Sequence, residues 1–200
     1  MSIPEEKQSV HKRIKDRRAE RKEQIRKDMD LYGSKILNSD EMREAFGQTH
    51  HLWSTVGEHT LRVASSSLRI CYALRRLHIR TDIPAVVKGS LGHDLGMLGR
   101  YEKYASKQEC GREHPRDSVK IARELEEDLP KQTADIIERH MWPAGKSKFP
   151  NSLECAIVSV ADKYVSVKDL FKGSDVKHTG VKNVVHGRIE KIRNRKSDDS

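Results

Sequence analysis

Cysteine is scarce in this chain of 200 residues, and its cysteines form no paired motif. The three of them, Cys71, Cys110 and Cys155, are far apart and odd in number. That argues against the disulfide framework of a small secreted protein and against a zinc ribbon, which needs closely spaced ligand pairs. Cys110 lies four residues before His114, a spacing that zinc can use, but no second close pair joins it. We therefore expect reduced thiols, with Cys110 as an ordinary loop cysteine.

Long apolar runs are also missing. No run approaches the roughly 18–20 residues that a membrane-spanning helix needs, and the first residues, MSIPEEKQSV, contain no apolar signal core. Hydrophobic residues make up 35% of the chain and charged residues 34%, which indicates a packed centre with heavily charged ends. We expect a cytoplasmic protein with no membrane partner.

Aromatic residues are few, at 5%, and the basic N-terminal segment has none. The net charge of +9 favours anionic partners such as nucleotides or nucleic acid. Residues 5–31 contain no Gly or Pro and only sparse apolar positions, which predicts a mostly solvated helix with i,i+4 charge pairs. A nucleic-acid-binding arm is the alternative. Because the segment lacks aromatic rings that stack on bases, we favour the solvated helix.

Helical patterns without long period-two alternation predict an all-α fold. We expect three regions: residues 1–48 as a charged helical N-terminal extension, 49–171 as a helical domain, and 172–200 as a basic C-terminal tail. The most apolar segment, SLECAIVSVADKYVSVKDLF, predicts a central helix at the end of the domain.

Capping residues and prolines give the expected limits of the other helices. Asp82 is a plausible N-cap with Pro84 in the first turn, and that helix should stop near Gly96. A charged loop should then cover residues 96–114, with the next helix starting at Pro115 and a further one following Pro130.

Two polar residues, His93 and Asp94, stand among glycines and apolar residues in GSLGHDLGML. They are either satisfied locally at a helix end or serve as metal ligands. Asp162 lies in the apolar run VSVADKYVSV, so it must become neutral, find hydrogen-bond donors or bind a cation. The alternative for Asp162 is an ion pair with Lys163 or with an arginine.

Histidine and aspartate recur in a fixed order where helical patterns begin, end or are buried. The set comprises His59, His93, Asp94, His114, His140 and Asp162. Imidazole and carboxylate ligands in this mixture suit divalent Fe, Mn, Ni, Co or Zn. Six ligands exceed the need of one tetrahedral zinc and indicate two ions. Neighbours on a helix diverge by about 100°, but at a helix end Asp94 can bridge both ions while His93 binds one.

These residues stand in the motifs EHTLRVA, GHDLG, EHPRDSVKIA, IIERHMWP and SVADKY, between Thr49 and Phe171. With them the sequence resembles the HD-domain superfamily of metal-dependent phosphohydrolases. The resemblance implies a bundle of about five core helices, in agreement with the all-α prediction. It also implies that His59, His93, Asp94 and Asp162 form the core ligand set of one metal, and that His114 and His140 are the extra histidines of two-metal members.

The chain departs from the HD-GYP branch, which degrades cyclic-di-GMP. There a second histidine follows the one matched by His140, but Met141 stands at that position here. We therefore do not expect hydrolysis of cyclic-di-GMP.

The resemblance implies a phosphomonoesterase or phosphodiesterase that acts on a nucleotide or another small phosphorylated metabolite. Two metal ions would generate the attacking hydroxide from water and stabilise charge on the phosphoryl oxygens. Two alternatives stay open. Some members of the superfamily use the same ligand series as a mixed-valent di-iron oxygenase, and a non-enzymatic protein could bind a nucleotide or nucleic acid.

Residues around the ligands have expected supporting roles. Arg62, three positions after His59, and Lys163, beside Asp162, are the candidate cations for substrate phosphate, with an exposed arginine and an outward salt bridge as their alternatives. Glu58 and Asp117 are candidate carboxylates that orient imidazoles. The other histidines are expected at a helix entry or at the surface: His50 and His51 in the first group, and His78, His178 and His186 in the second.

Overall fold

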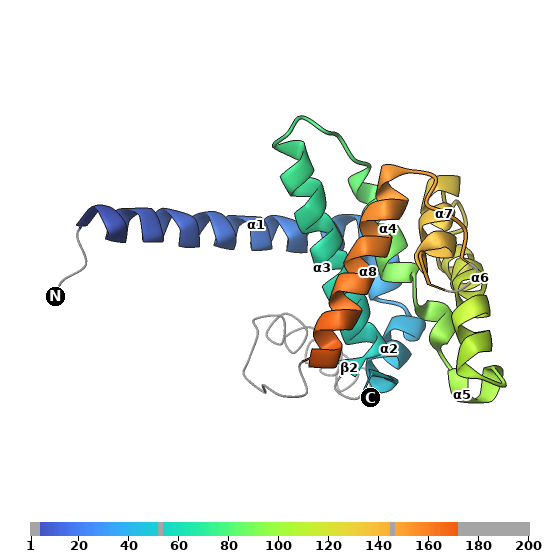
Figure 1. Ribbon diagram of the computed structural model, residues 1–200. Coiled ribbons are helices and arrows are strands. Elements are labelled where there is room, and N and C mark those ends of the chain that lie inside the picture. Colours follow the sequence, from blue (N-terminus) through green and yellow to red (C-terminus); the bar gives the residue numbers. More distant parts are fainter. Residues whose placement is uncertain (1–4, 52–53, 145–146, 172–200) are drawn as a thin grey trace, which may run out of the picture.

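The computed structural model describes residues 5–51, 54–144 and 147–171, and it is built from helices (Figure 1). The elements are α1 (Glu5–Leu37), α2 (Asp40–Gly47), β1 (Thr49–His51), β2 (Ser54–Thr55), α3 (Val56–Arg75), α4 (Ile83–Gly92), the 3-10 helix η1 (Leu95–Met97), α5 (Arg100–Lys103), α6 (Lys107–Leu125), α7 (Lys131–Arg139) and α8 (Leu153–Phe171). The all-α prediction is confirmed. The expected basic tail, 172–200, with His178 and His186, lies outside the described residues.

Helix α4 lies at the centre of a bundle and contacts α3, α7, α8 and the inner part of α1. It begins as predicted: the Asp82 side chain accepts a hydrogen bond from the Ala85 amide at 2.9 Å, with Pro84 in the first turn. It packs very closely on α7, because a Cβ at Gly89 would overlap the side chain of Ile136. The C-terminal end of α4, where His93 follows, is thereby fixed inside the bundle.

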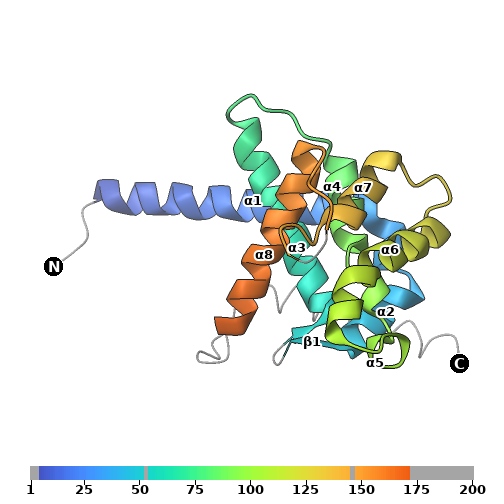
Figure 2. The same ribbon diagram turned by 45° about the vertical axis from the view of Figure 1, so that its right-hand side comes forward.

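Helix α1 has two parts with different surroundings. The outer part projects from the bundle (Figures 1 and 2), whereas Ile25, Met29 and Ile36 of the inner part are buried in the hydrophobic core. The Tyr72 hydroxyl of α3 donates a hydrogen bond to Asp28 of α1 and joins the two helices where they cross. The packed core therefore begins at about Ile25, within the segment that the sequence presents as a charged extension.

A short antiparallel hairpin of β1 and β2 precedes α3. The sequence did not predict it, because strands of two and three residues are too short to display an alternating pattern. Thr55 ends the hairpin and caps α3 in a capping box with Glu58. This hairpin places His50 beside the start of α3 and next to the end of α4.

The region before Pro115 differs from its prediction. Where a loop was expected over 96–114, the chain forms η1, α5 and the first two turns of α6. Ser106 caps α6, accepting a hydrogen bond from the Glu109 amide, and Pro115 lies buried inside the helix. A proline inside a helix costs about 3 kcal/mol, so it normally marks a helix start, but here the cap and the packing of α6 outweigh that cost.

Helix α8 confirms the expected central helix, with Val158, Ala161 and Val165 in the core. Its outer side carries polar residues and exposed apolar side chains such as Val160. Within the described parts of the chain, no helix combines the length and the hydropathy that crossing a bilayer requires.

Candidate metal centre

Six elements bring the six predicted ligands together inside the bundle. His59 comes from the first turn of α3, His93 and Asp94 join α4 to η1, His114 lies in α6, His140 ends α7, and Asp162 lies in α8. All six side chains are buried, with at most 5% of any residue exposed. Residues far apart in the sequence thus converge on one point, and burial alone demands partners for their polar atoms.

The carboxylate of Asp94 is the centre of this cluster, and its two oxygens face different histidines. Oδ1 lies 3.3 Å from Nε2 of His114 and 3.5 Å from Nε2 of His140. Oδ2 lies on the other side, 3.3 Å from Nε2 of His93 and 3.8 Å from Nε2 of His59. A carboxylate in this position has the arrangement that a bridge between two cations requires.

Three imidazole rings are oriented by the backbone. Each donates a hydrogen bond from Nδ1 to a carbonyl oxygen three or four residues earlier, at 2.7–2.8 Å, because a carbonyl can only accept. The pairs are His93 with Ser90, His114 with Cys110, and His140 with Ile137. Fixing the proton on Nδ1 leaves the Nε2 lone pair of a neutral ring pointing into the cluster, as metal coordination requires.

The contacts between these nitrogens fit a bound cation. Nε2 of His114 and Nε2 of His140 lie 3.1 Å apart, and burial lowers the pKa of His140 to about 4, so that this ring is neutral. Nε2 of His93 is buried without a hydrogen-bond partner among the described residues. Without a cation, one of these two rings would have to carry a second proton, on Nε2, in order to donate a hydrogen bond to the other ring. A metal ion that accepts these lone pairs removes that need, so the residues present fit a metal.

The charge of Asp94 is favourable for the same role. Burial disfavours the carboxylate, but His93, His114 and His140 outweigh that effect and hold the pKa of Asp94 well below its ordinary value. The ionised group offers both oxygens as acceptors. Three overlapping groups of side chains have ligand atoms close enough to share an ion: His50 with His59 and Asp94; His59 with His93 and Asp162; and His93 with Asp94 and His140.

His59 is held between two carboxylates. Its Nε2 lies 2.9 Å from Oδ1 of Asp162, and its Nδ1 lies 3.5 Å from Oδ2 of Asp169. Burial lowers the pKa of His59, but these two carboxylates outweigh burial and raise it to about 9. Sequence reasoning missed Asp169. The available signal was its spacing, since a residue seven positions after Asp162 lies on nearly the same face of α8.

His50 is the second residue that sequence reasoning missed. It was expected only as a helix-entry residue, but its Nε2 lies 3.3 Å from Oδ2 of Asp94, and its ring stacks on that of His59 with centroids 4.3 Å apart. Burial lowers its pKa, which favours the neutral ring that can bind a metal. The signal was weak, because only the unpredicted hairpin brings His50 to the cluster. The side chain of His51 is not described.

The supporting residues have contacts that differ from their expected roles. Arg62 points to Asp169, with Nη2 2.7 Å from Oδ2, and does not line the cavity described below. Glu58 accepts a hydrogen bond from the Thr55 amide in the capping box of α3. The carboxylate of Asp117 accepts a hydrogen bond from Tyr104 at 2.7 Å and pairs with lysines. The groups that orient the imidazoles are instead backbone carbonyls and Asp169.

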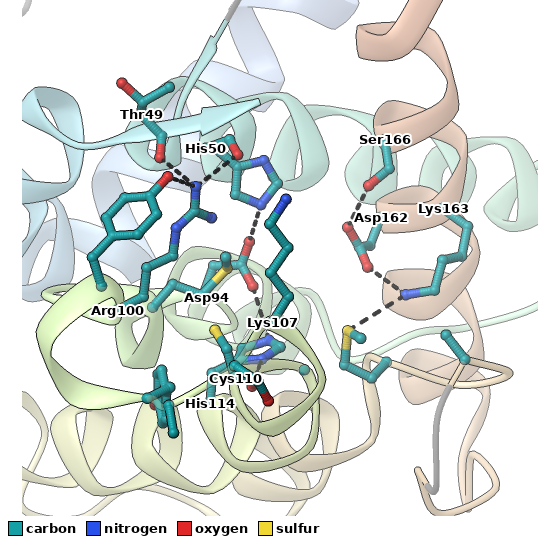
Figure 3. Close-up of a pocket in the computed structure, with 18 residues that line it drawn as sticks. Thr49, His50, Asp94, Arg100, Lys107, Cys110, His114, Asp162, Lys163 and Ser166 are labelled. Carbon is teal, nitrogen blue, oxygen red and sulfur yellow. Dashed lines mark hydrogen bonds and ion pairs between the residues drawn. The ribbon is translucent and has the colours of Figure 1, made fainter. Parts of the chain in front are cut away.

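A cavity of about 960 Å³ opens beside the cluster. Asp94, His50, His114 and Asp162 form part of its wall, so these four candidate ligands face it (Figure 3). Arg100, Lys107 and Lys163 are its cations, and Met97, Tyr101, Tyr104 and Met141 contribute apolar surface. Cys110, which was expected in a loop, is a buried residue of α6 that also lines this cavity.

Lys163 is the cation nearest to the cluster. Its Nζ lies 2.6 Å from Oδ2 of Asp162 and donates to the carbonyl oxygen of His140 at 3.3 Å. Lys107 has no hydrogen bond or ion pair with the described residues, and Figure 3 shows it extending across the cavity towards His50. Beside the candidate metal ligands the cavity therefore presents one positive charge held by Asp162 and a second, on Lys107, that has no partner in the described part of the chain.

Comparisons with known proteins agree with the motifs. The sequence model of the HD domain matches residues 56–166, a segment that contains all six predicted ligands but neither His50 nor Asp169. Neither the search of curated proteins nor the search of solved structures found a match. The matched segment covers more than half of the chain, and the chain therefore belongs to the HD-domain family.

Proposed function

We propose that this protein is a metal-dependent phosphohydrolase that cleaves a phosphomonoester or phosphodiester of a small metabolite, such as a nucleotide. The observation that carries the proposal is the position of Asp94. Its two oxygens face His114 and His140 on one side and His93 and His59 on the other, at the wall of a cavity bordered by cations. That combination suits two divalent ions next to an anionic substrate.

The candidate ligands divide into two sets that share Asp94. His114 and His140 would hold one ion, and His59, His93, Asp162 and His50 the other. When bound, such ions act as Lewis acids that lower the pKa of water and neutralise developing charge on phosphoryl oxygens. The carbonyl oxygens that accept from Nδ1 keep the rings oriented, so that their Nε2 atoms stay directed into the site.

Lysine and arginine side chains of this chain supply the remaining charge. Lys163, held beside Asp162, lies where it can donate to a phosphoryl oxygen next to the ligands. Lys107 enters the cavity from α6 without another partner among the described residues, so it is available for a substrate phosphate. Arg100 donates to the carbonyl oxygens of Thr49 and His50, and we assign it to holding the hairpin.

The size and lining of the cavity support an organic phosphate rather than free phosphate. Small-molecule sites occupy roughly 300–1,000 Å³, and this cavity lies at the upper end of that range. Met97 and Tyr101 give it apolar surface on which a base or another flat group can rest. We propose that the phosphate lies towards Lys163 and the organic group towards Tyr101.

Phosphate release tests the proposal. Protein purified without a histidine tag is assayed with Mn, Ni, Co or Fe against phosphomonoesters and phosphodiesters, nucleotides included. We expect metal-dependent phosphate release that Asp94→Asn abolishes and that the matched surface change, Asp128→Asn, leaves intact. Asp128 is exposed and lies outside the site. Equal activity of wild type and Asp94→Asn would contradict the proposal, and oxygen consumption without phosphate release would instead favour a di-iron oxygenase.

A further inference from the structure

Most charges of the projecting part of α1 are sorted onto opposite sides, except that Lys12 and Arg13 flank the acids. Because successive residues of a helix turn by about 100°, six cations between residues 7 and 22 fall within about 160° of the circumference. They are Lys7, Lys15, Arg17, Arg18, Arg21 and Lys22. The acids Asp16, Glu20 and Glu23 fall within about 60° on the opposite side. We call the side with the six cations the cationic face.

Internal ion pairs of α1 can involve only part of these cations. Opposite charges stand three or four residues apart at Lys12 and Asp16 and at Arg17 and Glu20, where they can pair along one side of the helix. The ion pairs described within α1 join Arg26 to Glu23 and to Asp30, near the bundle. The six residues of the cationic face are exposed or half-exposed, and no acid lies on that face between Lys7 and Lys22. Their positive charges therefore reinforce each other.

The cationic face continues the side of α1 that packs on the bundle. Ile25, Met29 and Ile36 share its direction around the helix axis and are buried in the core. In the outer part, the same side carries the six cations and only two apolar residues, Val10 and Ile14, so it offers little surface for packing against another apolar element. The outer part of α1 therefore presents positive charge on the side that, further along the helix, packs on the bundle.

Helix α3 extends this charge at the point where it crosses α1. The hydrogen bond from Tyr72 to Asp28 fixes the crossing. Arg69 and Arg76 lie three positions before and four after Tyr72, hence on the same side of α3, and both are exposed. The corner between the two helices is thus bordered by cations from both.

An extended anion is the ligand that this arrangement suits. The cations from Lys7 to Lys22 span roughly 22 Å of helix, too long for one small metabolite. No aromatic residue lies between them, which disfavours single strands that stack their bases on rings. Only Val10 and Ile14 add apolar surface, at 45% and 46% exposed, whereas membrane-surface helices carry a broad apolar face. A nucleic-acid duplex offers a dense row of phosphates and grooves that admit a helix.

We propose that the cationic face of α1, together with Arg69 and Arg76, binds duplex nucleic acid through its phosphates. Lysine and arginine side chains on this surface can bind phosphate oxygens. The described part of outer α1 has no Asn and no row of amide side chains that could read adenine edges. We therefore expect binding with little sequence preference. The proposal is independent of the reaction at the metal centre, because no residue of the cationic face lines the cavity.

Point substitutions test this surface better than deletion, because the inner part of α1 belongs to the core. The test variant is Lys15→Gln with Arg18→Gln, on the cationic face. The matched control is Lys12→Gln with Arg13→Gln, which removes the same charge from exposed positions flanking the acids. Fluorescence anisotropy with labelled duplex DNA and duplex RNA is measured over a series of KCl concentrations.

We expect binding of at least one duplex that weakens with salt. The test variant should lose tenfold or more in affinity, and its slope of log K against log salt should fall by about two, since each phosphate contact contributes about 0.9. The control should lose less than threefold. Lys15→Arg with Arg18→Lys, which keeps both charges, should bind like wild type.

Three results would overturn the proposal. Equal losses in the test variant and the control would show that only net charge matters. If neither duplex binds at 50 mM KCl, the interaction is excluded, because about 50 mM is a low salt concentration at which phosphate contacts are strong. Tighter binding to phosphatidylserine vesicles than to duplexes would assign the cationic face to a membrane surface instead.

Discussion

Asp169 lies behind the ring of His59, with its Oδ2 3.5 Å from Nδ1, on the side opposite Asp162. Arg62 holds the same oxygen of Asp169 at 2.7 Å. The ring is therefore oriented by a carboxylate that is itself anchored by a guanidinium. A carboxylate behind a metal-binding histidine fixes the ring and increases its basicity. Asp169 lies beyond the segment that matches the HD domain, whereas His59 and Arg62 lie within it.

Asp169→Asn should weaken metal binding without unfolding the protein. The amide keeps the size of the side chain but loses the charge that orients His59, and losing such a partner typically costs about 10–100-fold in metal affinity or activity. Metal affinity is measured by competition with a chelator, with far-UV circular dichroism as the check on folding. Asp128→Asn, at an exposed position, serves as the control. An unchanged affinity in Asp169→Asn would contradict the orienting role.

His50→Asn should also lower metal affinity, by roughly tenfold or more if His50 binds the ion directly or orients Asp94. The reason is the 3.3 Å distance from its Nε2 to Oδ2 of Asp94. His11→Asn is the matched control, because His11 is exposed on α1. Titration of the metal-free protein with Mn or Ni measures the effect, and equal affinities for the two variants would remove His50 from the site.

The sequence predicted those parts of the site that lie on regular elements. His59, His93, Asp94 and Asp162 stand at helix ends or in apolar runs, where an uncompensated polar side chain is costly. Asp82 with Pro84 and the apolar segment before Phe171 carried enough local signal to locate α4 and α8. These features depend on neighbouring residues alone, and for that reason they could be predicted.

The remaining features depend on contacts between distant segments. His50 reaches Asp94 only because a hairpin too short to show a pattern folds against α4. Pro115 looked like a helix start, yet the cap at Ser106 and the packing of α6 carry the helix through it. The inner part of α1 has few apolar residues, and its burial follows from the presence of α3 and α4 on one side.

Gly96→Ala should destabilise the protein by about 2 kcal/mol or more, the range for overpacking a tight contact. A Cβ at Gly96 would overlap the carbonyl oxygen of His114 and the amide of Ser118, both parts of the α6 backbone. Because His114 would have to move, metal affinity should fall as well. Gly47→Ala is the control, since its Cβ meets no atom within 4 Å. Chemical denaturation measures both variants, and equal stabilities would contradict the close approach of η1 to α6.

Asp117 gives a pH-dependent contribution to stability that can be isolated. Burial raises its pKa, but Lys120, Tyr104 and Lys103 outweigh burial and lower the pKa to about 2 from 3.8. A lowered folded-state pKa stabilises the protein fully above about pH 4, and this contribution is lost as the pH falls towards 2. The difference in unfolding free energy between wild type and Asp117→Asn should therefore shrink over that interval. A difference that stays constant from pH 5 to pH 2 would contradict the cluster around Asp117.

The metal content of protein purified without a histidine tag tests the central claim most directly. Inductively coupled plasma mass spectrometry on wild type and Asp94→Asn, loaded in parallel with Mn, Fe, Co, Ni or Zn and then desalted, gives metal per chain. The position of Asp94, with its two oxygens facing different histidines, predicts about two ions in the wild type. In Asp94→Asn we expect both ions to be lost or to bind only weakly. Equal metal content in the two proteins, or none in the wild type with every metal, would contradict it.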